Sequence, residues 1–511
     1  MTSPRRHAAL AGALFLLAVA WLAAFPRPRP VTAEDTPAET AAELRARLDA
    51  AFADASLEDA LVGALFVRLT DGAVLYEREA DRALIPASNQ KLVTTACALD
   101  RLGPDAELRT ELLRAGPIVA GTLRGSLVVR GGGDPSPGAR FDGEADGLCR
   151  RWARLAAERG IRRIEGDIVA DDRLFDRQGV HPEWPRDQLD RWYSAPASAL
   201  ALNDACVDVS VSAGARAGAP AEVKIAPGCR LFEVDNQCKT TADKAAHSVN
   251  ILRRPGTNRI SVRGAILVGA APVEASISVD QPALVFVACL RERLEEQGIE
   301  VAGEARLVRD AEKLAPAHPL AAHVSSVSQV LAVTNKRSQN HYAEQLFKLL
   351  GARAGGGGTY SGGARAASAF LEGLGAPAAS FTVTDGSGLA RGNRISPRTA
   401  VALLRRMEGH DRRDEWLASL ALGGQDGTLR TRFKAPAVAG RVLAKTGTIS
   451  GVSALSGYIL DPATREPAVA FSVIMNGLRQ GSARAREIQD AAVLAVAPHA
   501  AFPVDRPGRA R

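Results

Sequence analysis

A serine and a lysine stand three residues apart in the segment Pro86-Ala87-Ser88-Asn89-Gln90-Lys91-Leu92. The apolar spacing after this segment predicts a helix that starts near Ser88, and residues three apart share one helix face. An adjacent amine can activate a hydroxyl as a nucleophile, and the free N–H groups of a helix N-terminus favour the anion that forms on an attacked carbonyl. The plainer interpretation is a serine N-cap followed by a surface lysine, and the pair taken alone favours it.

Two further polar segments could complete such a site. Ser338 and Asn340 lie in a polar stretch before a predicted helix over 341–350, where a hydroxyl can pass a proton and an amide can bind a peptide. The segment Lys445-Thr446-Gly447-Thr448 ends a predicted strand. A lysine beside two hydroxyls suits a carboxylate, and the glycine would let a substrate backbone approach closely. Alone, these segments fit a polar helix cap and an edge-strand lysine equally well.

Lysine is scarce in this chain, since only nine of the 64 basic residues are lysine. Arginine does not deprotonate in proteins, whereas burial or a neighbouring cation can tune lysine into a base. A lysine kept in so arginine-rich a sequence therefore indicates a need for an amine. We expect Lys91 and Lys445 to be lysines of this kind, retained because their sites need an amine.

The composition is that of a globular protein, with 511 residues, 46% hydrophobic and 24% charged. The formal charge of +7 owes much to four arginines in the first 33 residues, which contain no acid. The remainder carries 60 basic and 57 acidic residues, which makes the chain a poor candidate for a dedicated nucleic-acid binder.

Residues 1–33 have the pattern of an export signal. Arg5 and Arg6 precede an uncharged apolar stretch over 8–25, prolines follow, and Ala33 offers a small residue at a cleavage point. An uncleaved anchor remains the alternative, because 18 apolar residues are at the short limit for spanning a bilayer. Both interpretations place the rest of the chain outside the cytoplasm, in the periplasm or an equivalent space.

An oxidising compartment makes the six cysteines informative. There is no CxxC pair, so a zinc ribbon is disfavoured. Cys229 and Cys238 flank one polar segment and are the predicted disulfide. Cys97 and Cys289 fall in helix-like apolar runs and are expected to be free and buried.

The remaining pattern predicts helices at both ends of the chain and strands between them. A hairpin over 64–77 turns at Asp71-Gly72, and three antiparallel strands are expected near the C-terminus. From about 125 to 285 short strands alternate with turn residues. The predicted elements are a helix over 37–60, strands over 126–130, 166–170, 206–212, 260–268 and 273–279, a helix over 284–298, strands over 442–446, 454–460 and 469–475, a helix over 483–497 and a disordered tail over 501–511.

SxxK, SxN and KTG occur in the order and contexts typical of class A β-lactamases and penicillin-binding proteins. Lys91 and Ser338 are 247 residues apart, however, which a compact β-lactamase does not allow. The chain resembles the DacB-like class C low-molecular-mass penicillin-binding proteins, the D-alanyl-D-alanine carboxypeptidase/endopeptidase family. Segments that resemble the family elsewhere are Arg130-Gly131-Gly132-Gly133-Asp134-Pro135, Gly166-Asp167-Ile168-Val169-Ala170-Asp171-Asp172, Ala195-Pro196-Ala197-Ser198-Ala199-Leu200, Asp385-Gly386-Ser387-Gly388-Leu389-Ala390-Arg391 and Gln425-Asp426-Gly427-Thr428-Leu429.

The resemblance implies an α+β fold. A β-lactamase/transpeptidase-like domain, with a five-stranded antiparallel sheet between helices, would comprise residues 34–124 and 286–500. A β-rich insert over 125–285, of two small subdomains, would interrupt it.

The resemblance also implies the chemistry. The substrates would be peptidoglycan stem peptides that end in D-alanyl-D-alanine, and β-lactams would be covalent inhibitors; no metal or cofactor is expected. Ser88 would attack, Lys91 would be the base, and Ser338 with Lys445 would protonate the leaving D-alanine. The residues expected to bind substrate are Asn340 for the peptide amide, Thr446 and Thr448 for the terminal carboxylate, Gly447 beside them, Arg391, and the N–H groups of Ser88 and Thr448 as the oxyanion hole.

Other functions fit the sequence less well. The sequence has no HExxH and no GxSxG, so a zinc peptidase and an α/β-hydrolase are disfavoured. A β-lactamase or esterase on the same serine and lysine, and a non-catalytic cell-wall scaffold, stay as alternatives. Peripheral association with the membrane or with a wall-synthesis complex, and the balance of carboxypeptidase and endopeptidase activity, are left open by the sequence.

Overall fold

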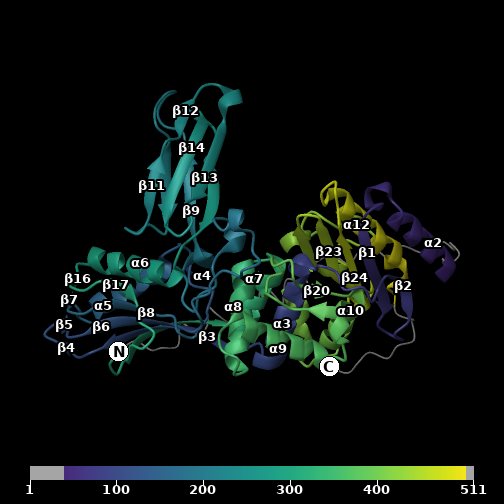
Figure 1. The fold of residues 1–511 in the computed structure, drawn as a ribbon, viewed down its shortest axis with the longest axis horizontal. Coiled ribbons are helices and arrows are strands. Elements are labelled where there is room, and N and C mark those ends of the chain that lie inside the picture. The colour runs from purple at the N-terminus through teal and green to yellow at the C-terminus, as the bar shows by residue number, and fades with distance from the viewer. Residues whose placement is uncertain (1–39, 502–511) are drawn as a thin grey trace. The chain divides into compact units, whose positions relative to one another are not determined.

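The computed structural model describes residues 40–501 (Figure 1). The predicted export signal over 1–33 lies outside the described residues, as does the predicted tail after residue 501. Within residues 40–501, no helix combines the length and the apolar character needed to cross a membrane.

The main sheet has six strands in the order β2-β1-β24-β23-β22-β21, and every neighbouring pair is antiparallel. Its hairpin and its three C-terminal strands confirm the sequence prediction. The sixth strand, beyond the five that the resemblance implied, is the two-residue β21. The bounds are β1 Leu61–Arg68, β2 Val74–Arg78, β21 Ala421–Leu422, β22 Val442–Ile449, β23 Val452–Leu460 and β24 Pro467–Asn476.

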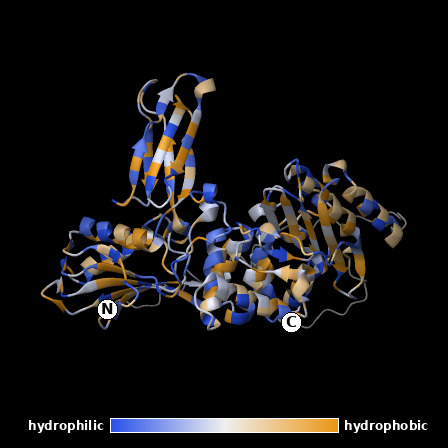
Figure 2. Ribbon diagram, in the orientation of Figure 1, coloured by the Kyte–Doolittle hydropathy of each residue, from blue (hydrophilic) through white to orange (hydrophobic). Residues whose placement is uncertain are grey.

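Both faces of this sheet are buried, and each faces its own hydrophobic core. Because side chains alternate along a strand, Ala454 and Tyr458 of β23 enter one core while Leu455 and Ile459 enter the other. Figure 2 shows long hydrophobic runs along β23 and β24. Helices α2 and α12 cover one face, and α3 and α7 to α11 belong to the core on the other. The bounds are α2 Ala41–Phe52, α3 Gln90–Leu102, α7 Val327–Lys336, α8 Asn340–Arg353, α9 Tyr360–Gly373, α10 Pro397–Glu408, α11 Arg413–Ser419 and α12 Ala483–Val496.

The first helix is shorter than the predicted range of 37–60. It ends at Phe52, and Asp54 then caps a short 3-10 turn, η2 (Ala55–Leu57), by accepting the Ser56 N–H at 3.0 Å. A local side-chain bond of this kind competes with helix continuation.

The middle of the chain contains a mixed sheet of five strands in the order β17-β8-β6-β3-β18, beside a small sheet of order β16-β7-β5-β4. Helices α5 (Gly147–Glu158) and α6 (Pro282–Glu296) pack in the same hydrophobic core as these two sheets. The larger sheet continues across the predicted insert boundaries at 125 and 285, because β3 precedes the first and β17 and β18 follow the second. The bounds are β3 Glu107–Ala115, β4 Ile118–Val119, β5 Thr122–Leu123, β6 Ser126–Gly131, β7 Arg163–Ile164, β8 Ile168–Asp171, β16 Glu300–Val301, β17 Ala305–Leu307 and β18 His318–Ser326.

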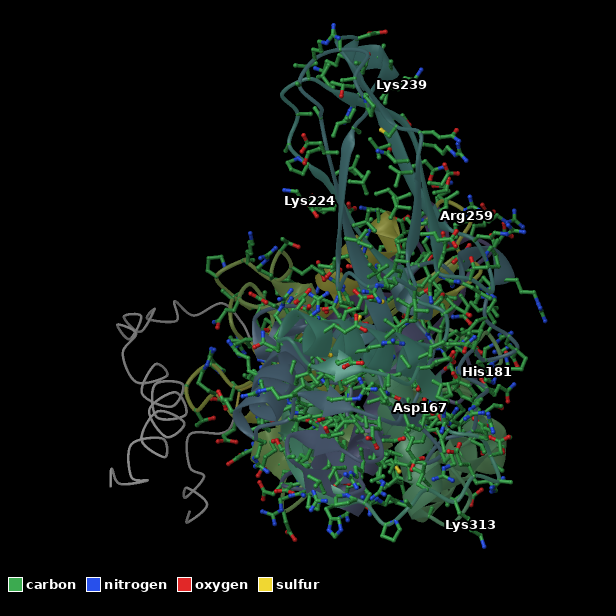
Figure 3. The ribbon with its side chains drawn as sticks, turned by 90° about the vertical axis from the view of Figure 1, so that its left-hand side faces the viewer. Asp167, His181, Lys224, Lys239, Arg259 and Lys313 are labelled. Carbon is green, nitrogen blue, oxygen red and sulfur yellow. The ribbon has the colours of Figure 1, made fainter. Side chains whose placement is uncertain are left out.

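Two more sheets lie between β8 and α6 in the sequence, in the orders β10-β9-β15 and β11-β14-β12 with β13 paired to β14. Their strands alternate hydrophilic and hydrophobic residues (Figure 2), as expected of sheets with solvent on one face. Figure 3 shows Lys224 and Lys239 on these strands with their side chains directed outward, and both are exposed. The bounds are β9 Cys206–Ser212, β10 Glu222–Ala226, β11 Glu233–Asn236, β12 Lys239–Thr241, β13 Ser248–Arg253, β14 Arg259–Leu267 and β15 Val273–Ser278.

All six cysteines are free and buried, so the predicted disulfide between Cys229 and Cys238 is wrong, whereas the expectation for Cys97 and Cys289 is confirmed. Cys229 lies against α6, because its neighbour Gly228 accepts a hydrogen bond from Arg293 at 3.2 Å. Cys238 is held elsewhere, since its carbonyl oxygen accepts the Ala221 N–H at 2.9 Å. Tertiary contacts direct the two thiols to different neighbours.

Candidate active site

Ser88 lies in a 3-10 turn, η3 (Ala87–Asn89), immediately before α3. The Lys91 ammonium is 3.0 Å from the Ser88 hydroxyl oxygen, as the three-residue spacing predicts. Asn89 ties the turn to β23 by donating its side-chain N–H to the Ser456 hydroxyl at 2.7 Å. Ala87 has φ of +47°, a left-handed conformation that costs energy for a residue with a Cβ. This turn, called the nucleophile turn because Ser88 is the expected nucleophile, is therefore held in place by the sheet behind it.

Lys91 is fully buried and makes two further hydrogen bonds. Its Nζ donates to the Asn340 side-chain oxygen at 2.6 Å and to the Ser387 carbonyl at 2.8 Å. Burial lowers the pKa of Lys91 to about 7, against the attraction of the nearby Glu344 and Asp385 carboxyl groups. A neutral amine beside the Ser88 hydroxyl is thus available near neutral pH.

Ser338 lies between α7 and α8 with φ of +58°, another left-handed residue other than glycine. Lys445 of β22 is buried, and its Nζ donates to the Ser338 hydroxyl at 2.8 Å and to the Thr446 carbonyl at 2.7 Å. Burial, and then repulsion from Lys91, hold the pKa of Lys445 well below its usual range. This repulsion also shows that the two lysine–serine pairs, Lys91 with Ser88 and Lys445 with Ser338, lie close together.

Gly447 is also required for packing inside the protein, in addition to the approach of substrate that the sequence suggests. A Cβ at this position would lie 2.6 Å from the Pro86 carbonyl oxygen and 3.1 Å from the Ser88 nitrogen. The nucleophile turn therefore approaches Gly447 closely and packs directly on β22. Thr446 donates to the Thr428 hydroxyl at 2.9 Å, and Thr448 is exposed.

Residues from the middle of the chain also reach the site. Asn340 donates its side-chain N–H to the Tyr193 carbonyl at 2.7 Å, so its amide bridges Tyr193 and Lys91. Trp184 donates its ring N–H to the Asp385 carboxylate at 2.9 Å, within the loop that contains Ser387. The mid-chain segment around Trp184 and Tyr193 is thus part of the framework of the site.

The structure brings the serines and lysines of all three motifs together with Asn340. Arg391 is exposed, and it donates to the Ser450 carbonyl at 2.9 Å, two residues after Thr448. Sequence reasoning did not single out Tyr193 or Glu344, although Asn340, Glu344 and Lys348 are spaced by four along α8 and so share a face. That spacing was the available signal.

Residues 44–498 match the model of the D-Ala-D-Ala carboxypeptidase 3 (S13) family. The chain belongs to this family. It is accordingly a serine-type carboxypeptidase, a hydrolase of the penicillin-binding-protein type that acts in the cell wall.

Two relatives show how far the likeness extends. A D-alanyl-D-alanine carboxypeptidase of Actinomadura sp. (strain R39) is 37% identical over 471 residues, which cover 90% of this chain and 85% of the relative. The D-alanyl-D-alanine carboxypeptidase DacB of Haemophilus influenzae is 25% identical over 429 residues, with 83% and 87% covered.

The fold is that of a solved structure, penicillin binding protein 4 (dacB) from Haemophilus influenzae. The TM-score is 0.74 at 23% identity, and the match covers 91% of this chain and all of that one. A structure of the same protein complexed with a β-lactam matches with a TM-score of 0.71.

Proposed function

We propose that the chain is an exported DD-peptidase that cleaves the D-alanyl-D-alanine bond of peptidoglycan stem peptides through an acyl-enzyme on Ser88. The observation that carries the proposal is the buried Lys91 amine at 3.0 Å from the Ser88 hydroxyl. An amine whose pKa is about 7 can accept the hydroxyl proton at neutral pH, which a surface lysine cannot do.

In the acylation step, Ser88 Oγ bonds to the penultimate carbonyl carbon while its proton passes to Lys91. The N–H groups of Ser88 and Thr448 would stabilise the resulting oxyanion. The C–N bond then breaks, and Ser338, backed by Lys445 at 2.8 Å, would protonate the leaving amine. The proton held by Lys91 would pass to Ser338 and so restore the neutral amine. Lys91 would then take a proton from water as it attacks the ester, and that proton would return to Ser88 as the ester C–O bond breaks.

The substrate-binding roles belong to the same proposal. Asn340 would hold the peptide amide, and Thr446 and Thr448 would hold the terminal carboxylate beside the Lys445 charge. Gly447 would support these residues indirectly, by letting β22 pack on the nucleophile turn. Arg391 would contact substrate from the loop whose Ser387 carbonyl accepts from Lys91.

Penicillin is expected to acylate the same serine, because its lactam carbonyl takes the place of the scissile amide. A relative's solved complex with a β-lactam supports this. The intact mass of the protein should rise by one penicillin, peptide mapping should place the adduct on Ser88, and Ser88→Ala should abolish it. A fully folded protein that forms no adduct would refute the proposal.

The same acyl donor occurs in cross-linked wall peptides, where only the leaving group differs, so we include endopeptidase activity in the proposal. Release of D-alanine from a pentapeptide measures one activity, and mass analysis of digested cell-wall sacculi measures the other. Rapid penicillin turnover without D-alanine release would favour a β-lactamase, and a Ser88→Ala chain that complements a deletion would favour a scaffold.

We also propose the location and the domain division. The pattern of residues 1–33 supports export, and fractionation of cells tests it: the mature chain should be outside the cytoplasm, and a salt-releasable membrane fraction would indicate peripheral association. The pairing of β3 and β18 supports an insert that extends from about Glu107 to about Ser326 rather than from 125 to 285.

A further inference from the structure

A buried carboxyl group lies beside Lys91 with no part in the reaction described above. Glu344 is on α8, one turn after Asn340, and is fully buried. Its two oxygens accept the N–H groups of Gly386 at 2.9 Å and Ser387 at 2.7 Å. The carbonyl of that same Ser387 accepts the Lys91 amine at 2.8 Å. One residue thus separates the Glu344 carboxyl group from the base.

Only a carboxyl group fits this position well. It offers an acceptor to each of two neighbouring N–H groups, whereas a glutamine of the same size would direct N–H atoms at one of them. The loop is also confined on its other side, because a Cβ at Gly388 would lie 1.8 Å from the Ala87 carbonyl oxygen. The 386–387 peptide is therefore fixed between α8 and the nucleophile turn.

The charges around Glu344 come from four elements. Lys91 lies on α3, Asp385 in the loop, Lys348 one turn further along α8, and Tyr360 on α9. Burial, and then the Asp385 carboxyl group, raise the pKa of Glu344 to about 8. Three lysines and two carboxyl groups, Lys91, Lys348 and Lys445 with Glu344 and Asp385, thus gather in one buried region.

We propose that Glu344 is a positioning residue for Lys91, on which it acts through Ser387. The carboxyl group holds the N–H groups of Gly386 and Ser387 so that the Ser387 carbonyl faces the Lys91 amine. That carbonyl, together with any negative charge on Glu344, favours the ammonium form and fixes the amine beside Ser88. This role of Glu344 deepens the proposed function, and the expected effect on the acylation rate rests on that function.

Glu344→Gln is the decisive variant. Without the paired hydrogen bonds to Glu344, the Ser387 carbonyl is no longer held against Lys91. The ammonium form then loses an acceptor, so the titration midpoint of Lys91 should fall by roughly half a pH unit or more. The amine is also less well placed, so the plateau rate of acylation by fluorescent penicillin should fall about tenfold or more. A merely structural role would lower the melting temperature without moving the midpoint.

The scarcity of lysine makes the midpoint directly measurable. The nine lysines, labelled with ¹³C at Cε, give at most nine signals, and Lys91→Arg identifies the one from Lys91. Gln345→Met is the matched control: Gln345 is the next buried residue of α8 and donates to the Ser198 carbonyl instead. It should leave the Lys91 midpoint unchanged and the acylation rate within about twofold of the unmodified chain.

An unchanged Lys91 midpoint in folded Glu344→Gln would overturn the inference. If that variant does not fold, Glu344→Asp replaces it, because the shorter side chain cannot reach both N–H groups; it should shift the midpoint in the same direction, and an unchanged midpoint again overturns the inference. Failure of the proposed function has a different signature, namely an unmodified chain that penicillin does not acylate.

Discussion

The close packing of β22 on the nucleophile turn predicts the effect of one added methyl group. In Gly447→Ala, the new Cβ would lie 2.6 Å from the Pro86 carbonyl oxygen and 3.1 Å from the Ser88 and Asn89 nitrogens. All three are backbone atoms, so no flexible side chain can move aside. Either β22 or the turn must shift.

The size of the shift follows from these distances. Ordinary van der Waals contact begins near 3.4 Å, so the two backbones must separate by about 0.8 Å. Lys445 and Thr446 would move with β22, and Ser88 with the turn. A misplacement of about 1 Å costs reaction rates about 100-fold, and overpacking costs about 1–3 kcal/mol of stability. We therefore expect acylation to fall far more than stability.

The assay is the second-order rate of labelling by fluorescent penicillin, with melting temperature measured on the same samples. Gly373→Ala is the matched control, because a Cβ there meets nothing within 4 Å at the end of α9. The control should keep its labelling rate within about twofold and its stability within about 0.5 kcal/mol. A Gly447→Ala chain that is labelled at the unmodified rate would refute the packing argument.

Four further outcomes are expected. Lys91→Arg keeps the charge but loses the titratable amine, so the folded variant should take no penicillin label; undiminished labelling would contradict this. Acylation of the unmodified chain should rise about tenfold per pH unit below pH 7 and level off above it, because only neutral Lys91 can accept the proton; a flat profile from about pH 5 to about pH 8 would exclude it. Lys445→Ala should raise KM for a pentapeptide about tenfold or more by removing the carboxylate's partner, and unchanged kinetics would count against that role. Peptide mapping without reductant should recover Cys229 and Cys238 in separate peptides, and a linked pair would contradict the structure.

Local signals were enough to predict the elements that carry the site. The Asp71-Gly72 turn specified the β1–β2 hairpin, and the three-residue spacing of Ser88 and Lys91 specified their contact. Short strand-like segments separated by turns likewise specified three antiparallel strands near the C-terminus. In each case, residues close in sequence decide the outcome.

Features that depend on distant partners were not predictable in this way. Strand β3 joins the mid-chain sheet because β6 and β18 pair with it, and neither pairing leaves a mark on residues 107–115. The sequence likewise gave no sign that Gly447 faces Pro86, that Cys229 lies against α6, or that Glu344 binds the 386–387 peptide. Family resemblance supplied the roles of residues, but only the three-dimensional contacts supplied these reasons.

The pairing of β1 with β24 has a consequence for folding during synthesis of the enzyme. Leu61 pairs with Asn476, so the sheet that backs Ser88 cannot close until residue 476 has been made. At about 5–20 residues per second, the intervening stretch of about 400 residues delays closure by roughly 20–80 seconds. A ribosome that stalls before residue 467 leaves β1 paired with β2 alone, so truncated products lack a folded peptidase that could attack the wall.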